Sequence, residues 1–362
     1  MGATGEAGTG LLAGLRVLDL SIWRPGPYAT QLLAEIGADV LKVEPPGGDP
    51  MRQYPELFLS LNANKRSIVL DLKDPADRAR ALELAAEADV VVEGFRPGVT
   101  DRLGVGYAEV RAVNPTIIYC SVSGMGQDGP LARVPGHDLN YQAWAGVLAP
   151  EGGPPVVPAV PLADLAGGMA AAFAVCAAAL RRANTGEGER IDVAMSDVLA
   201  TWTGAARPVA RGVDPSARGV PGYGVFETAD GQHLTIGIVS EDHFWQRLCD
   251  ALGLSGVRDV GFAERVGRGV ELQSLVAGAI RAREREPLVD ALAAADVPVA
   301  PVLDRTRMLA QSHFRERRVS TADPWADPAI GYPVRFADHA AARVTPPPDL
   351  DEHRGSGFLP RG

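Results

Sequence analysis

Two side chains between residues 136 and 168 can exchange protons near neutral pH, His137 and Asp164. A glycine- and proline-rich segment separates them, and an apolar run at residues 169–180 follows the aspartate and predicts a buried helix. Histidine titrates near neutral pH, and a carboxyl group does so when burial raises its pKa. The pair could therefore act as two acid/base groups that face one substrate carbon.

Each of these residues also has an ordinary structural role. Asp164 could be the N-cap of the helix that follows it. His137 could be a loop histidine bonded to a backbone carbonyl, and Asp138 could be a turn residue or could orient its neighbour. Residue type and order alone leave these alternatives open.

The start of the helix after Asp164 offers a further element of such a site. Backbone N–H groups at a helix start can stabilise a negatively charged oxygen that develops during a reaction. Gly167 and Gly168 have no side chains, so we expect the backbone to approach a ligand closely there.

The segment from residue 136 to 168 must be positioned by the helices and strands around it, and the sequence predicts that these alternate. Short apolar runs predict strands at residues 15–20, 39–44, 67–70, 90–93 and 117–122, and helices are predicted between them at 26–37, 75–88 and 107–113. This alternation places the chain in the doubly wound α/β class, with a parallel sheet. The loop after the first strand lacks the GxGxxG pattern, so no nicotinamide cofactor is expected.

The second half of the chain predicts a smaller α+β unit. The strands at 224–228 and 233–237 are joined by a hairpin turn, and helices are predicted at 241–251, 271–283 and 286–295. We predict a large domain of residues 1–204, completed by 325–362. A linker at 205–223 leads into a small domain of residues 224–324, and the proline-rich end of the chain should wrap over a surface.

Composition excludes several kinds of partner. The net charge of -10 argues against a nucleic-acid partner, which needs a basic face. The three cysteines lie apart in apolar runs and predict buried free thiols, and no His/Cys spacing suits a metal. We expect a cytoplasmic protein with no membrane contact, because residues 1–10 do not resemble a signal peptide and no apolar run reaches about 20 residues.

Seven short motifs, taken in order, point to a known family. They are GADV at 37–40, KVEP at 42–45, NKRS at 64–67, GFRPGV at 94–99, GMGQDGP at 124–130, GHD at 136–138 and PVAPV at 298–302. With them the chain resembles the class III CoA-transferase (CaiB/BaiF) family over nearly its whole length, and within that family the α-methylacyl-CoA racemases. The resemblance implies a large Rossmann-like domain with a smaller domain, in an interlocked homodimer whose active site lies between the two subunits.

The resemblance also assigns roles to residues. It matches Asp164 to the catalytic aspartate that racemases and transferases share, and His137 to the histidine of the racemases. Glu241 falls near a glutamate that supports this histidine, although the adjacent Asp242 leaves the choice open. The substrate would be an acyl-CoA thioester, so coenzyme A enters as part of the substrate, and neither a cofactor nor a metal is implied.

The function expected from this resemblance is inversion of the α-carbon of a 2-methylacyl-CoA by proton transfer through an enolate. His137 favours this expectation, and so does the lack of a glycine-rich run between residues 224 and 253. The small number of methionines counts against it. The alternative is a CoA-transferase in which Asp164 is a nucleophile that forms an anhydride and then a CoA thioester. A CoA-binding protein without catalysis is a third possibility.

Basic residues at strand ends are candidates for the phosphates of coenzyme A, because open α/β sheets bind ligands there. The candidates are Arg24, Lys42, Lys65, Arg66 and Arg96, with Arg96 favoured by the resemblance. We add Asp138 and Tyr141, beside His137, as substrate contacts. Each basic residue could instead be a solvated surface charge.

Overall fold

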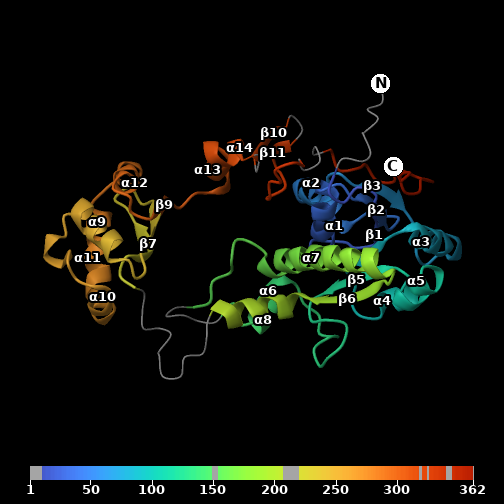
Figure 1. Ribbon diagram of the computed structural model, residues 1–362. Coiled ribbons are helices and arrows are strands. Elements are labelled where there is room, and N and C mark those ends of the chain that lie inside the picture. Colours follow the sequence, from blue (N-terminus) through green and yellow to red (C-terminus); the bar gives the residue numbers. More distant parts are fainter. Residues whose placement is uncertain are drawn as a thin grey trace. The chain divides into compact units, whose positions relative to one another are not determined.

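The computed structural model describes residues 10–148, 154–206, 220–317, 320–323, 326–339 and 345–361, and it divides into two compact units (Figure 1). The first comprises Met1–Pro150, Pro155–Pro208 and His313–Gly362, and the second comprises Glu151–Pro154 and Val209–Ser312. The described residues from 313 to 323, which we had placed in the small domain, group with the first unit. Most of the predicted linker, residues 207–219, lies outside the described residues.

The first unit is built on a six-stranded parallel sheet. Its strands are β1 (Arg16–Asp19), β2 (Asp39–Glu44), β3 (Arg66–Val69), β4 (Val90–Glu93), β5 (Ile118–Ser123) and β6 (Glu189–Ala194). Their order is β3-β2-β1-β4-β5-β6, which is the order of doubly wound dinucleotide-binding sheets. The predicted α/β class is confirmed. The strand order reverses between β1 and β4, where sheets of this kind form their ligand crevice.

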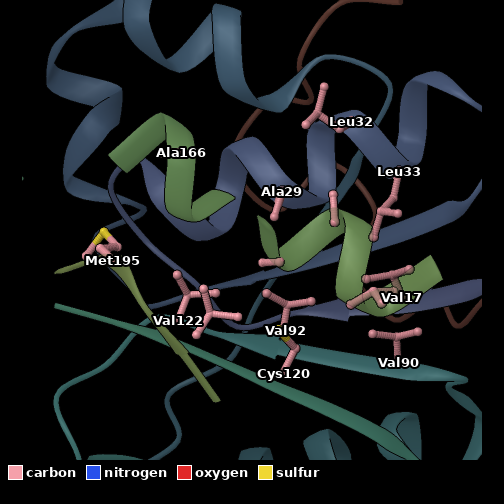
Figure 2. Close-up of a cluster of buried hydrophobic side chains, with 14 of the residues drawn as sticks. Val17, Ala29, Leu32, Leu33, Val90, Val92, Cys120, Val122, Ala166 and Met195 are labelled. Atoms are coloured by element: carbon pink, nitrogen blue, oxygen red, sulfur yellow. The ribbon is translucent and has the colours of Figure 1, made fainter. Parts of the chain in front are cut away.

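Two apolar cores lie on opposite faces of this sheet, because successive strand residues point to opposite sides. On one face, Val17, Val90 and Val92 pack against α1 (Pro25–Glu35) and α7 (Leu162–Thr185), as Figure 2 shows. On the other face, Leu18 and Val91 pack against α3 (Pro75–Glu87) and α5 (Tyr107–Val113). Strands β1 to β5 are therefore largely buried on both sides, which explains their apolar runs, whereas the first four residues of β6 are not buried.

Helix α7 begins at Leu162, whereas the predicted helix began after Asp164, and it runs for 24 residues. By length and composition it is the one helix among the described residues that could cross a membrane. The core helix of a soluble protein meets the same criteria. Here 44% of its apolar window is buried inside the protein, against α1, α8 (Met195–Ala206), β5 and β6. Its apolar character therefore follows in part from its position in the core.

The segment from 345 to 361 covers the edge of the sheet. The backbone N–H of His353 donates to the carbonyl of Ser67 (3.0 Å), and that of Val69 donates to Oδ1 of Asp351 (2.9 Å). An open edge strand would expose unpaired backbone groups to other chains. The prediction that this segment wraps over a surface is thus confirmed for the described residues, and the surface is β3.

The second unit contains a three-stranded antiparallel sheet of β7 (Tyr223–Glu227), β8 (His233–Gly237) and β9 (Val299–Pro301). Its core joins this sheet to α9 (Asp242–Leu252), α11 (Gly269–Arg281) and α12 (Arg285–Ala294). The remaining elements of the two units are η1 (Pro50–Gln53), α2 (Pro55–Asn62), α4 (Val99–Leu103), α6 (Asp138–Trp144), η2 (Ser255–Val257), α10 (Phe262–Gly267), α13 (Arg305–Leu309), α14 (Ser312–Glu316), β10 (Ser320–Asp323) and β11 (Ala326–Ile330).

The three cysteines are free thiols. Cys120 and Cys249 are buried as predicted, whereas Cys176, on α7, is only partly buried.

Candidate active site

A cavity of about 600 Å³ opens in the first unit at the carboxyl edge of the sheet. Its lining includes the segment 22–25 after β1, the segment 94–97 after β4 and the segment 122–125 at the end of β5. The first two segments follow β1 and β4, the strands on either side of the point where the strand order reverses. The cavity therefore lies where a doubly wound sheet is expected to bind its ligand.

His137 and Asp164 both line this cavity, as the sequence predicted. His137 is the N-cap of α6, and its backbone N–H donates to Oδ1 of Asn140 (3.0 Å). Its side chain is exposed, so the imidazole is open to a ligand. Helix α6 was not among the predicted helices, although a loop position for His137 had been one of the alternatives.

Asp164 lies inside the first turn of α7, and the N-cap position belongs to Pro161. The N-cap alternative for Asp164 is therefore wrong. Burial and the nearby charge of Asp138 raise the pKa of Asp164 to about 6, while the Arg24 guanidinium, 3.9 Å away, opposes this rise. Asp164 is thus a partly buried carboxyl group that changes charge just below neutral pH.

Asp138 caps α7 from outside the helix. Its Oδ1 accepts hydrogen bonds from the backbone N–H groups of Ala163 (2.7 Å) and Asp164 (3.2 Å), and its Oδ2 accepts one from Gln142. Helix starts leave such N–H groups without intrahelical partners. Asp138 therefore links α6 to α7 and fixes the position of Asp164, which makes it a structural neighbour of the reacting group.

The predicted oxyanion site at the start of α7 does not fit the structure. The N–H groups of Ala163 and Asp164 are already bonded to Asp138. A Cβ on Gly167 would lie 2.5 Å from Cγ of Met195, and a Cβ on Gly168 would lie 2.6 Å from the carbonyl oxygen of Pro25. The two glycines thus allow close packing of α7 against other parts of the protein, not close approach of a ligand.

Tyr141 forms part of the cavity wall and is 8% exposed. Its hydroxyl donates to the carbonyl of Gly136. A Cβ on Gly124 would lie only 2.2 Å from its ring, which explains the glycine in that motif. Burial, with the nearby Asp164 charge, raises the pKa of Tyr141. Tyr141 therefore stays neutral and shapes the wall.

Arg24 and Arg96 are the predicted basic residues that reach the cavity. Arg24 precedes α1 and faces Asp164, whereas Arg96 is exposed, and no ion pair of its guanidinium is found within the described part of the chain. The neighbour of Arg24, Trp23, has a φ of 65°, which is unusual for a bulky residue and typical of functional loops.

Lys42, Lys65 and Arg66 do not reach the cavity, so their predicted phosphate role does not fit the structure. The side chains of Lys42 and Lys65 are fully buried, and each forms an ion pair with a buried carboxylate, Asp49 or Asp19. Arg66 begins β3 and pairs with Asp39, which begins β2, at 2.7 Å. It therefore lies at the amino edge of the sheet, opposite to the cavity.

Glu241 belongs to the second unit, where it is the N-cap of α9. Its Oε2 accepts a hydrogen bond from the backbone N–H of Val239 (2.9 Å). It does not line the cavity described here. Its suggested support of His137 stays a prediction.

Much of the cavity lining was missed. It includes Trp23 and an apolar group from η1 and α2, namely Met51, Tyr54 and Leu57. The prolines that begin these short helices, Pro50 and Pro55, were a signal that we did not use. Within the described residues, no group of three or more metal-ligating side chains is arranged to hold a metal ion.

A carboxyl group with a raised pKa, set at the crevice of a doubly wound sheet, defines this as an α/β enzyme site. The sequence matches the model of CoA-transferase family III over residues 12–354, so the chain belongs to that family. The predicted family resemblance is confirmed.

The chain is similar over nearly its whole length to curated CoA-transferases and to a solved structure. The chain is 35% identical to an acetyl-CoA:oxalate CoA-transferase of Acetobacter aceti over 366 residues, which cover 94% of this chain and 92% of that one. It is 35% identical to a succinyl-CoA:mesaconate CoA-transferase of Haloarcula hispanica over 382 residues, 95% of each chain. The fold matches that of a CaiB/BaiF family protein from Brucella suis with a TM-score of 0.86 and 30% identity, covering 96% of this chain and 98% of that one.

The names of these relatives favour the alternative branch of the family. We had preferred the racemases, but both curated relatives are named as CoA-transferases. The preference rested on the histidine at position 137 and on the lack of a glycine-rich run between residues 224 and 253. Because His137 is also the N-cap of a helix, its presence discriminates poorly between the two activities.

The raised pKa of Asp164 predicts how its charge depends on pH. The carboxylate is present above about 6 and is lost as the pH falls through this value, so any reaction that needs the anion should lose rate there. Because the Asp138 charge raises this pKa, we expect Asp138→Asn, which keeps an oxygen for the cap, to move the acid limb to lower pH. Rate measurements from pH 4.5 to 8 test this, and an acid limb that stays in place or moves upward would contradict it.

Proposed function

We propose that this protein moves coenzyme A from an acyl-CoA to a second carboxylic acid, with Asp164 as the nucleophile. The observation that carries this proposal is the position of Asp164, which is the one carboxyl group among the described residues that line the cavity. Its ionised form is the nucleophile, and a pKa of about 6 leaves most of it ionised at neutral pH. The names of the relatives support the same chemistry.

The proposed reaction has two matched halves. The Asp164 carboxylate attacks the thioester carbonyl, which forms a mixed anhydride and releases the CoA thiolate. The thiolate then attacks the aspartyl carbonyl, which forms an aspartyl-CoA thioester and releases the first acid with one oxygen from Asp164. The acceptor carboxylate attacks this thioester, and the released thiolate attacks the acceptor carbonyl of the new anhydride. The products are the new acyl-CoA and an Asp164 carboxylate that holds one oxygen from the acceptor.

Arg96 is the proposed partner of a CoA phosphate. It is exposed at the cavity, and its guanidinium forms no ion pair with the described residues. Its charge is therefore available to bind an anion. Arginine binds phosphate through two parallel hydrogen bonds. Arg24 has a different proposed role. Its guanidinium lies 3.9 Å from the Asp164 carboxylate and favours the anionic form of that group.

Oxygen transfer gives a direct test of the mechanism. The protein is incubated with an acyl-CoA and a panel of mono- and dicarboxylic acids labelled with ¹⁸O in the carboxyl group. We expect a new acyl-CoA and ¹⁸O in the peptide that contains Asp164, one atom after a single turnover and up to two after many, measured by mass spectrometry. A new acyl-CoA without label in this peptide would overturn the proposed role of Asp164. Binding of acyl-CoA without any exchange would indicate a non-catalytic CoA-binding protein.

A racemase is the second candidate, because His137 and Asp164 line the same cavity. Two acid/base groups could remove an α-proton from one face of a thioester and return one to the other face. The test is incubation of a chiral 2-methylacyl-CoA in deuterated water without an acceptor acid. Deuterium at the α-carbon together with loss of chirality would favour the racemase, and the absence of both would reject it.

We also propose the homodimer that the family resemblance implied. Support comes from α7, where Met169, Phe173 and Leu180 are 48%, 77% and 67% exposed. These residues follow one another at helical spacing, so they form one apolar face of the helix. A second copy of the chain would cover this face.

A further inference from the structure

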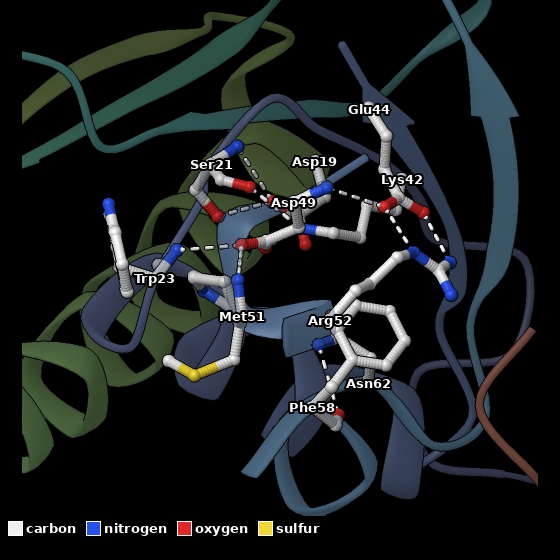
Figure 3. Close-up of polar contacts among 12 residues, drawn as sticks. Asp19, Ser21, Trp23, Lys42, Glu44, Asp49, Met51, Arg52, Phe58 and Asn62 are labelled. Atoms are coloured by element: carbon white, nitrogen blue, oxygen red, sulfur yellow. Dashed lines mark hydrogen bonds and ion pairs between the residues drawn. The ribbon is translucent and has the colours of Figure 1, made fainter. Parts of the chain in front are cut away.

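A cluster of buried charges lies beneath the loop that leads into α1, and the proposed reaction does not use it. The cluster contains Asp19, Lys42, Glu44, Asp49 and Lys65, all of which are buried. Figure 3 shows Asp19, Lys42 and Asp49 next to the loop residue Ser21, whereas Glu44 lies farther from the loop and binds Arg52. Charged groups lose their hydration when they are buried, which is costly unless partners replace the water. The partners of the two lysines indicate what the cluster does.

Lys42 connects the cluster to the loop on the side that precedes Arg24. Its Nζ lies 3.0 Å from Oδ2 of Asp49 and donates a hydrogen bond to the backbone carbonyl of Ser21 (2.7 Å). Asp49 also accepts from the backbone N–H of Trp23 (3.4 Å), the residue with the positive φ. Both backbone groups belong to a segment without regular secondary structure. These bonds, together with those that Ser21 donates to Asp19, hold the path of this segment.

Lys65 makes the equivalent connection on the side that follows Arg24. Its Nζ lies 3.1 Å from Oδ2 of Asp19 and donates to the backbone carbonyl of Pro27 (2.9 Å), in the first turn of α1. It also donates to Oδ1 of Asn62 (2.9 Å). Two buried ammonium groups therefore hold the chain on both sides of Arg24.

Arg24 is the residue whose position this arrangement determines. It lies between the two anchored carbonyl groups, and its guanidinium is 3.9 Å from Asp164. A shift of the loop would change this distance and with it the electrostatic support of the Asp164 anion. Neither lysine lines the cavity, so each can act on the site only through the loop.

We propose that Lys42 and Lys65 are positioning residues that hold Arg24 against Asp164 through the carbonyl groups of Ser21 and Pro27. The inference rests on the proposed function only in that Asp164 is the reacting group. It predicts that removing either ammonium group has the same kind of effect on Asp164 as removing Arg24 itself.

The test measures the protonation of Asp164 without relying on activity. A carbodiimide modifies protonated carboxyl groups, and peptide mass spectrometry reports the labelling of Asp164 as a function of pH. Because Arg24 lowers the pKa of Asp164, both Arg24→Gln and Lys42→Met should move the labelling midpoint to higher pH. The transfer rate should fall on the order of ten- to a hundredfold, as is usual when a group near the reacting atoms is misplaced.

Two further variants keep the test decisive. Lys42→Met/Asp49→Leu removes the whole ion pair and avoids an unpaired buried charge, so it should fold even where Lys42→Met does not. Lys42→Met added to Arg24→Gln should cause no further shift, because the lysine acts through Arg24. The matched control is Arg182→Met, which breaks the partly buried pair with Asp89 at the other edge of the sheet and should leave the midpoint unchanged.

An unchanged midpoint in folded Lys42→Met or Lys42→Met/Asp49→Leu would overturn the proposal. An equal shift with and without Arg24 would also overturn it. The proposed function fails separately, because the labelling midpoints are measured whether or not the wild-type protein transfers coenzyme A.

Discussion

Asp164→Asn should lower the rate of CoA transfer on the order of 10⁴-fold or more, the scale seen when covalent nucleophiles are removed. The amide has nearly the same shape as the carboxylate but cannot attack a thioester, so no anhydride forms. The cap from Asp138 binds the backbone of residue 164 and not its side chain, so the helix should remain in place. The measurement is acyl-CoA exchange by mass spectrometry, with acyl-CoA binding by calorimetry to show that the cavity is intact.

The control for this variant is Asp77→Asn, which makes the same chemical change in the first turn of another helix, α3. Asp77 accepts a hydrogen bond from the backbone of Asp71, and asparagine keeps an oxygen for it. We expect this control to retain the wild-type rate. Transfer by Asp164→Asn within tenfold of the wild type would show that Asp164 is not the nucleophile.

Gly168→Ala should lower the free energy of unfolding by about 1–3 kcal/mol, because overpacking a tight contact costs this much. The new Cβ would lie 2.6 Å from the carbonyl oxygen of Pro25 and 2.9 Å from Cδ1 of Tyr28. Helix α7 must therefore move away from the start of α1, which separates Asp164 from Arg24. We expect the transfer rate of the folded variant to fall as well, and urea unfolding with rate measurements tests both effects.

Gly204→Ala is the matched control for this substitution. Gly204 lies in α8, and no atom of the described residues lies within 4 Å of its Cβ position. Alanine is a better helix residue than glycine, so this variant should gain about 0.5–1 kcal/mol. Equal stability changes in the two variants would show that the contact between α7 and α1 is not tight.

The sequence predicted the helices and strands that show a clear pattern of apolar residues along a single segment. Strands β1 to β5 contain apolar runs because both of their faces are largely buried. Short helices such as α2 and α6 were missed, since a single turn or two leaves little periodic pattern. The start of α7 was placed too late, because its cap, Asp138, comes from another helix and leaves no signal next to residue 162.

The sequence predicted those cavity residues whose side-chain chemistry alone suggested a role. His137 and Asp164 reach one cavity, as a proton-handling pair near a helix start suggested. Lys42 and Lys65 were misplaced because a charged residue near the end of a strand can point into solvent or into a buried cluster, and the sequence does not show which. Their partners Asp49 and Asp19 come from separate loops and strands, and only the folded chain brings them together.

The cover on strand β3 sets an order of events during protein synthesis. Val69 and Asp351 are bonded to each other but are 282 positions apart in the chain. The ribosome therefore completes the six strands of the sheet long before it makes the segment that seals β3. Throughout this interval the nascent chain carries an open strand edge, so the first unit reaches its final state only after translation has nearly ended.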